Sequence, residues 1–187
     1  QPAQSFYVWG AQVEAGSFPT SYIPTTSSAV TRAADVASIE GTNFSSFYNQ
    51  SEGTVFAQYG GGRLTAYPQG LGRIATTEAW SMEHGSTPIK RQFGVTSGSY
   101  NDFNGSVNAD TGYPKYAIAY ASSTYVAAAS DGLLETSIIG SVTFSQTSSK
   151  FTVGQASNYI FQLNGHIARL AYFPTRKTDQ ELIDLTT

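Results

Sequence analysis

The sequence predicts an all-β fold, an antiparallel two-sheet β-sandwich that ends in a short C-terminal α-helix. Short runs of β-branched and aromatic residues recur along the middle of the chain, separated by turn signals at intervals of roughly 8 to 15 residues. No long run in that region shows the 3.6-residue period of an amphipathic helix. The 187-residue chain has 12 Tyr, 11 Phe and 18 Gly, and only 12% of its residues are charged. This composition is typical of β-rich surfaces that lie against other surfaces.

Composition also excludes several kinds of function. The chain has no Cys, so neither a disulfide framework nor a thiolate metal site is available. Its net charge of −3 and the shortness of its basic cluster Lys90-Arg91 argue against a nucleic-acid partner. No apolar run approaches the length that a membrane span requires, so no membrane partner is expected. Stability must therefore come from packing in a domain of ordinary size.

The first 34 residues are expected to form an extended linker or an isolated strand. Residues 6–10 are a compact apolar strand candidate. Pro19 and Pro24 follow, and proline cannot donate a hydrogen bond to a sheet, so the rest of this stretch is predicted to be a connector or an edge.

A series of strands is expected between the first section and the terminal helix. Residues 116–120 and 124–129 are predicted to form a hairpin joined through Ser122 and Ser123, and Asp131-Gly132 supplies the next turn. The other expected strands cover residues 53–59, 73–76, 80–83, 92–95, 141–144, 150–154 and 166–173.

A single good helix is predicted at residues 179–186. Thr178 precedes it and Glu181 lies three positions later, which is the spacing of a capping box. Leu182 and Leu185 then share one face, so we expect the helix to dock on the sandwich through that face. Asp179, Glu181 and Asp184 form the densest acidic cluster, and its place in this helix indicates a favourable interaction with the helix dipole.

Two stretches of the sequence resemble a known family. One runs through residues 10–16, 20–25 and 30–35, beginning Gly-Ala-Gln-Val-Glu-Ala-Gly, and the other covers residues 163–174 with 179–182. Both resemble bacteriophage and prophage virion proteins, including tail-fibre subunits, whose C-terminal parts carry a concanavalin A-like, laminin G-like jelly roll.

The resemblance implies a domain organisation and a setting. Residues 1–34 would be an extended linker or the last strand of an upstream module, and residues 35–187 would be the jelly roll. It further implies a homotrimer, other virion proteins as partners, and an extracellular location on the phage tail or surface. No coiled-coil heptad supports the trimer independently.

The patterns of known catalytic sites are missing. Sandwich glycosidases carry Glu-x-Asp-x-x-Glu on one strand, and nucleophilic hydrolases carry Gly-x-Ser-x-Gly; neither string occurs here. His166 is expected to be a half-exposed strand residue without a catalytic role. The chain is therefore predicted not to be an enzyme, with a cryptic polysaccharide hydrolase built on Glu78 and Glu83 left as an alternative.

A glycan site is expected instead, because such sites combine an aromatic platform with a few polar groups. The candidate ligand-binding residues are Trp80, Glu83, His84, Tyr100, Asn101, Asp102, Asn104 and Tyr113. His84 is placed in a loop. Residues 101–105 are also placed in an oxygen-rich loop, which leaves Ca²⁺ open as a ligand; no other cofactor is expected.

The function expected from the sequence is that of a non-catalytic virion domain that binds host-surface polysaccharide. A purely structural domain that decorates or trimerises a virion remains the alternative.

Overall fold

The computed structural model describes residues 5–15, 20–32, 36–60, 69–74, 80–84, 90–94, 100–104, 113–121, 125–135, 148–155, 163 and 165–187, with the backbone alone for 69, 73, 80–84, 90–94 and 100–104. The chain divides into two compact units, Gln1–Asp35 and Val36–Thr187. Neither helix in the described part of the chain is long and apolar enough to cross a membrane.

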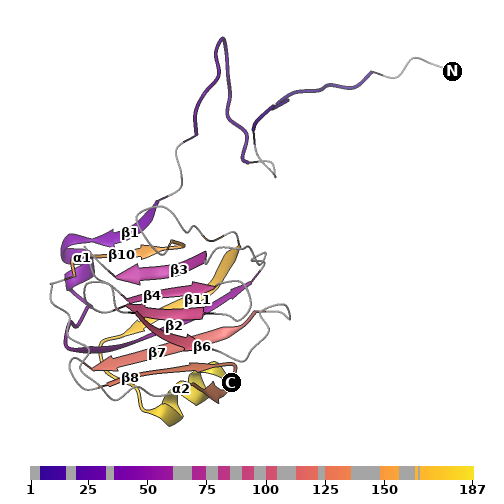
Figure 1. The fold of residues 1–187 in the computed structure, drawn as a ribbon. Helices are drawn as coiled ribbons and strands as arrows, with labels where there is room; N and C mark the ends of the chain where they lie inside the picture. Colours follow the sequence, from indigo (N-terminus) through magenta and orange to yellow (C-terminus); the bar gives the residue numbers. More distant parts are fainter. Residues whose placement is uncertain are drawn as a thin grey trace. The chain divides into compact units, whose positions relative to one another are not determined.

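Two antiparallel sheets form the larger unit (Figure 1). The six-stranded sheet has the order β1 (Ala37–Glu40), β10 (Lys150–Val153), β3 (Gln69–Ile74), β4 (Trp80–His84), β5 (Lys90–Gly94) and β6 (Tyr100–Asn104). The five-stranded sheet has the order β11 (His166–Phe173), β2 (Glu52–Gly60), β7 (Lys115–Ala121), β8 (Tyr125–Ser130) and β9 (Leu133–Leu134). The predicted β-sandwich with a C-terminal helix is confirmed.

The main core lies between the two sheets. Val55, Ala57 and Tyr59 alternate along β2 on the inner side, because successive residues of a strand face opposite ways. The core is completed by buried residues of the other strands and of α1 (Gly41–Ser45): Phe44, Leu71, Ile74, Tyr116, Ile118, Tyr120, Val126, Ala128 and Phe151.

A second core lies on the outer face of the five-stranded sheet, under helix α2 (Asp179–Thr186). Leu182 is fully buried there against Phe56 and against the alanines at 117, 119, 127 and 129. These small side chains leave the helix room to approach the sheet closely. Because β2, β7 and β8 are covered on both faces, most of their residues are buried without alternation along the strand.

Three predicted local features of the C-terminal half are confirmed. The capping box is present, with Thr178 accepting from the Glu181 N–H and the Glu181 carboxylate accepting from the Thr178 N–H. The strands β7 and β8 pair as the expected hairpin. The Asp131-Gly132 turn follows, with φ of 43° and 77°, values that Asp and Gly adopt more readily than most residues.

Several predictions from the sequence are wrong. Residues 6–10 form no strand, because no partner strand hydrogen-bonds to them within the described part of the chain. Residues 101–104, expected to lie in a loop over 101–105, belong to β6 (Tyr100–Asn104), and His84 closes β4 instead of lying in a loop. The elements β1 and α1 were not anticipated. The predicted strand at 141–144 lies outside the described residues.

In the smaller unit, side-chain hydrogen bonds of Gln12 and Glu14 hold a short segment together. The Glu14 carboxylate accepts from both the N–H and the hydroxyl of Thr20, and these hydrogen bonds lower the pKa of Glu14. Gln12 accepts from the N–H of Ile23 at 2.8 Å and so connects the two sides of the segment.

Candidate functional site

The best-defined surface feature lies where three strands of the five-stranded sheet come together at one end. Strand β2 ends at Gly60, β7 begins at Lys115 and β11 begins at His166. The register pairs His166 with Gly60 and Lys115 with Gln58. Tyr113 lies two residues before β7, so its ring belongs to the same end of the sheet. We call Gln58, Gly60, Tyr113 and His166 the Tyr113 rim.

The Tyr113 ring lies directly over Gly60. A Cβ atom at position 60 would come within 2.5 Å of two carbons of that ring, so only glycine leaves the ring where it is. The Gln58 side chain donates to the Tyr113 carbonyl at 3.4 Å, and the Tyr59 N–H donates to the Pro114 carbonyl at 3.3 Å. Although its backbone is held in this way, the Tyr113 side chain is 52% exposed.

The imidazole of His166 lies beside the Tyr113 ring. The two ring centroids are 5.9 Å apart with an interplanar angle of 46°, and the Tyr113 hydroxyl is 3.4 Å from Nε2 of His166. Both residues are exposed. The pair therefore combines an exposed aromatic surface with a hydroxyl and an imidazole nitrogen, groups that can both donate and accept hydrogen bonds.

A stacked pair of tyrosines lies next to the rim on the core side. The rings of Tyr59 and Tyr116 are 5.4 Å apart and tilted by only 26°, and each side chain is almost completely buried. Packed aromatic rings of this kind have few alternative rotamers, so the strand ends that carry the rim are held rigidly.

Seven of the eight residues predicted to bind ligand lie on two strands of the other sheet. Trp80, Glu83 and His84 are on β4, and the remaining four are on β6, with β5 between the two strands: Tyr100, Asn101, Asp102 and Asn104. Tyr113 is at the end of the five-stranded sheet. The structure therefore does not bring the eight residues onto one sheet, and their role in binding stays a prediction.

The register divides these seven positions between the two faces of the six-stranded sheet. Trp80 is opposite the buried Ile74 on one side and opposite Phe93 on the other, and Phe93 is opposite Asn101. Directly opposed positions share a face. Positions 80, 84 and 101 therefore share the face of Ile74, which is the core face. The opposite face carries positions 83, 100, 102 and 104.

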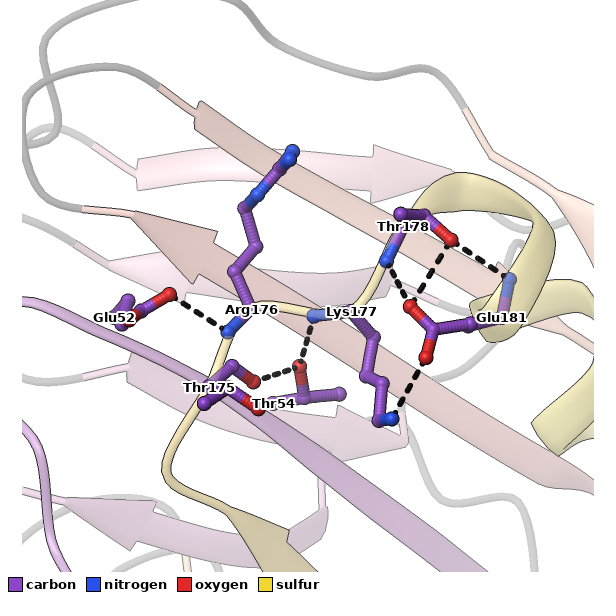
Figure 2. Close-up of polar contacts among 7 residues, drawn as sticks. All are labelled: Glu52, Thr54, Thr175, Arg176, Lys177, Thr178 and Glu181. Carbon is purple, nitrogen blue, oxygen red and sulfur yellow. Dashed lines mark hydrogen bonds and ion pairs between the residues drawn. The ribbon is translucent and has the colours of Figure 1, made fainter.

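Glu181, in the first turn of α2, has a structural role (Figure 2). Glu181 accepts from the Lys177 ammonium at 2.8 Å and from the Thr178 N–H at 2.8 Å. The Lys177 contact and the Thr178 hydrogen bonds lower the pKa of Glu181 to about 2.

Two strand residues anchor the segment before this helix, as Figure 2 also shows. Glu52 accepts from the Arg176 N–H at 3.0 Å, and the Thr54 hydroxyl both donates to the Thr175 carbonyl and accepts from the Lys177 N–H. The network therefore fastens α2 to β2.

The alternatives of a metal site and a hydrolase site gain no support from the described residues. Among them, no three His, Asp or Glu side chains gather as a metal ion would require. The predicted Ca²⁺ loop, residues 101–105, lies within β6 up to residue 104, and residue 105 lies outside the described part of the chain. Glu78 of the hydrolase pair also lies outside it.

No family model matches the sequence, and no curated protein matches it. Solved structures do match the fold. The CBM40 of the Ruminococcus gnavus IT-sialidase, solved with α2,6-sialyllactose, has a TM-score of 0.61 and 13% identity over 74% of this chain and 85% of its own.

Two further structures are similar in fold. A heptameric SAP-like pentraxin from Limulus polyphemus has a TM-score of 0.59 and 11% identity over 75% of this chain and 74% of its own. A structure of botulinum neurotoxin type C, whose cell entry depends on interaction with two ganglioside molecules, has a TM-score of 0.57 and 11% identity over 73% of this chain and 35% of its own. At these identities the likeness establishes the fold alone, a concanavalin A-like jelly roll.

Proposed function

We propose that this chain is a non-catalytic domain that binds host-surface polysaccharide through the Tyr113 rim. We further propose that it belongs to an extracellular part of a phage virion, such as a tail fibre, as the sequence resemblance implies. The observation that carries the binding proposal is the exposed Tyr113 ring, which is held over Gly60 beside the imidazole of His166.

The geometry of the rim suits a sugar. A pyranose presents apolar C–H groups on one face and hydroxyls around its edge, so it fits an aromatic surface flanked by hydrogen-bonding groups. Tyr113 supplies the surface, and His166 supplies a nitrogen that donates to or accepts from a sugar hydroxyl. Rigid support beneath the ring lowers the entropy cost of binding.

The similar folds support the same kind of ligand. The Ruminococcus gnavus domain was solved with a sialylated sugar, and the neurotoxin interacts with gangliosides during cell entry.

A catalytic role is not proposed for the rim, because a glycosidase would need two carboxylates flanking the scissile bond. The Asp131 carboxylate, on the turn after β8, is already engaged. It accepts from the Lys115 N–H at 2.7 Å and thereby holds that turn.

A titration with host-surface polysaccharides tests the proposal. Tyr113→Ala is expected to weaken binding about tenfold or more, because a central aromatic contact is lost. Tyr22→Ala is the matched control, since Tyr22 is similarly exposed, at 47%, but lies in the other unit. Equal affinities for Tyr113→Ala and the unmodified chain would contradict a role for the rim.

A double-mutant cycle with Gly60→Ala sharpens the test. The added methyl group must displace the Tyr113 ring, so it is expected to weaken binding in the unmodified chain. It should have no further effect once Tyr113 is already alanine. An additive loss in the double variant would show that Gly60 acts through something other than the ring.

A second candidate function, virion assembly, is favoured by an apolar stretch in the smaller unit. Phe6, Tyr7, Val8 and Trp9 are all at least 76% exposed. Contiguous exposed apolar residues are typical of protein-interaction sites. Sedimentation equilibrium would reveal the predicted trimer, and replacing Tyr7 and Trp9 by Ser should then dissociate it. A monomer at micromolar concentration would contradict this role.

A further inference from the structure

We propose that the larger unit has a second binding site, an apolar cavity that takes the end of a medium-length alkyl chain. The cavity has a volume of about 280 Å³ and lies between the two sheets, near the edge strands β1 and β11. It belongs to the larger unit alone, and its walls share no residue with the Tyr113 rim.

The walls of the cavity come from facing rows of the two sheets. Ile39, Phe151 and Ile74 are opposite one another across β1, β10 and β3, and together they form one wall. The facing wall includes Val55 of β2 and Leu170 of β11. The remaining lining residues are Phe47, Ala171 and Tyr172.

The lining of the cavity is mainly apolar. Its one lining hydroxyl, that of Tyr172, is already engaged: it accepts from the Asn49 N–H at 3.0 Å and lies 3.0 Å from the Tyr120 hydroxyl. A polar ligand would therefore lose its hydrogen bonds with water without replacement. An apolar cavity of this kind also has no partners for ordered water.

The mouth of the cavity lies between unpaired strand edges. Among the described strands, β1 pairs only with β10 and β11 pairs only with β2, so each is the edge of its sheet. Ile39 lines the cavity and is 38% exposed, so it lies where the cavity meets solvent. A ligand thus has a route into the space between the sheets.

The volume selects the size of the ligand. Protein interiors contain few voids larger than a water molecule. A cavity of about 150 Å³ lined by Leu, Ile and Phe holds one benzene molecule. The cavity here has almost twice that volume, which corresponds to an alkyl chain of about six to eight carbons. The chain end of a free alkyl compound and that of a sugar-linked lipid both meet this requirement.

A series of straight-chain 1-alkanols from pentanol to decanol tests the proposal on the full chain. Methyl resonances of Ile39, Val55 and Leu170 report binding by NMR. Affinity is expected to rise about fourfold per added methylene and to stop rising near eight carbons, when the cavity is full. Intermolecular NOEs from the alkyl chain to these methyl groups locate the ligand without any substitution.

Two variants provide the matched comparison. Ile39→Phe fills the mouth and is expected to weaken octanol binding more than tenfold. Val36→Phe adds the same ring at a position next to β1 that is 56% exposed and does not line the cavity, so it should bind as the unmodified chain does. Tyr113→Ala should also bind alkanols normally, which separates this proposal from the glycan proposal.

A comparison of octanol with octyl β-glucoside tests whether the natural ligand is a free alkyl compound or a sugar-linked lipid. Binding of octyl β-glucoside as tight as that of octanol would support a sugar-linked chain, and binding of octanol alone would support a free one. Absence of saturable binding by any alkanol would overturn the proposal. So would affinity that is independent of chain length or equal effects of the two Phe substitutions.

Discussion

Replacing Leu182 by alanine tests how helix α2 is held on the sandwich. Leu182 is the fully buried hydrophobic residue of the helix and packs against Phe56 and the small alanines of β7 and β8. These alanines belong to paired strands, so they cannot move outward to fill the space that a shorter side chain would leave. The substitution therefore removes buried methyl groups and leaves a cavity.

The expected loss of unfolding free energy is about 3 kcal/mol, within the range of roughly 2 to 5 kcal/mol for buried Leu→Ala changes. A domain of this size loses roughly 2 to 4 °C of Tm per kcal/mol, so Tm should fall by about 6 to 12 °C. The β-sandwich itself should remain folded, because its main core does not include Leu182.

Urea unfolding monitored by tryptophan fluorescence and circular dichroism measures the change, provided that the m-value is unaltered. Leu133→Ala is the control, since Leu133 is 59% exposed and the same truncation there should cost less than about 0.5 kcal/mol. A loss below about 1 kcal/mol for Leu182→Ala would refute the packing argument, because it would mean that the helix is not held by this side chain.

Two further predictions concern Glu181 and Trp80. The folded-state pKa of Glu181, about 2, lies below its usual value of 4.5, so its stabilising effect is present above pH 4.5 and is lost as the pH falls towards 2. Glu181→Gln should remove the loss of Tm between pH 4.5 and 2 that is due to protonation of Glu181. The same fall of Tm with pH in this variant would show that Glu181 does not stabilise the fold in this way. Trp80→Ala should lower Tm by several degrees, because position 80 is opposite the buried Ile74. An unchanged Tm together with lost glycan affinity would instead indicate that Trp80 binds the glycan, as predicted from the sequence.

The features predicted correctly from the sequence depend on neighbours along the chain. The Thr178–Glu181 capping box, the Asp131-Gly132 turn and the β7–β8 hairpin each involve residues close in sequence, so their residue types and spacing were sufficient. The sandwich could be predicted because many short β-rich runs leave few other ways to bury their apolar residues.

The wrong predictions arose where strand pairing, which the local residue types do not reveal, outweighs local preference. Asn and Asp in residues 101–104 favour turns, yet this segment pairs with β5 and becomes a strand. Residues 6–10 have strong strand propensity, but no strand among the described residues pairs with them, and they form no strand. Local propensity is weak beside the hydrogen bonds and packing that a neighbouring strand supplies.

The sequence by itself therefore determined the fold class, the terminal helix and its cap. Only the tertiary structure decided that Tyr113 lies over Gly60 beside His166, and that Ile39 and Leu170 face each other across a cavity. These contacts join residues that are distant along the chain. They exist because of the order and register in which the strands pair, and no short-range pattern encodes that order.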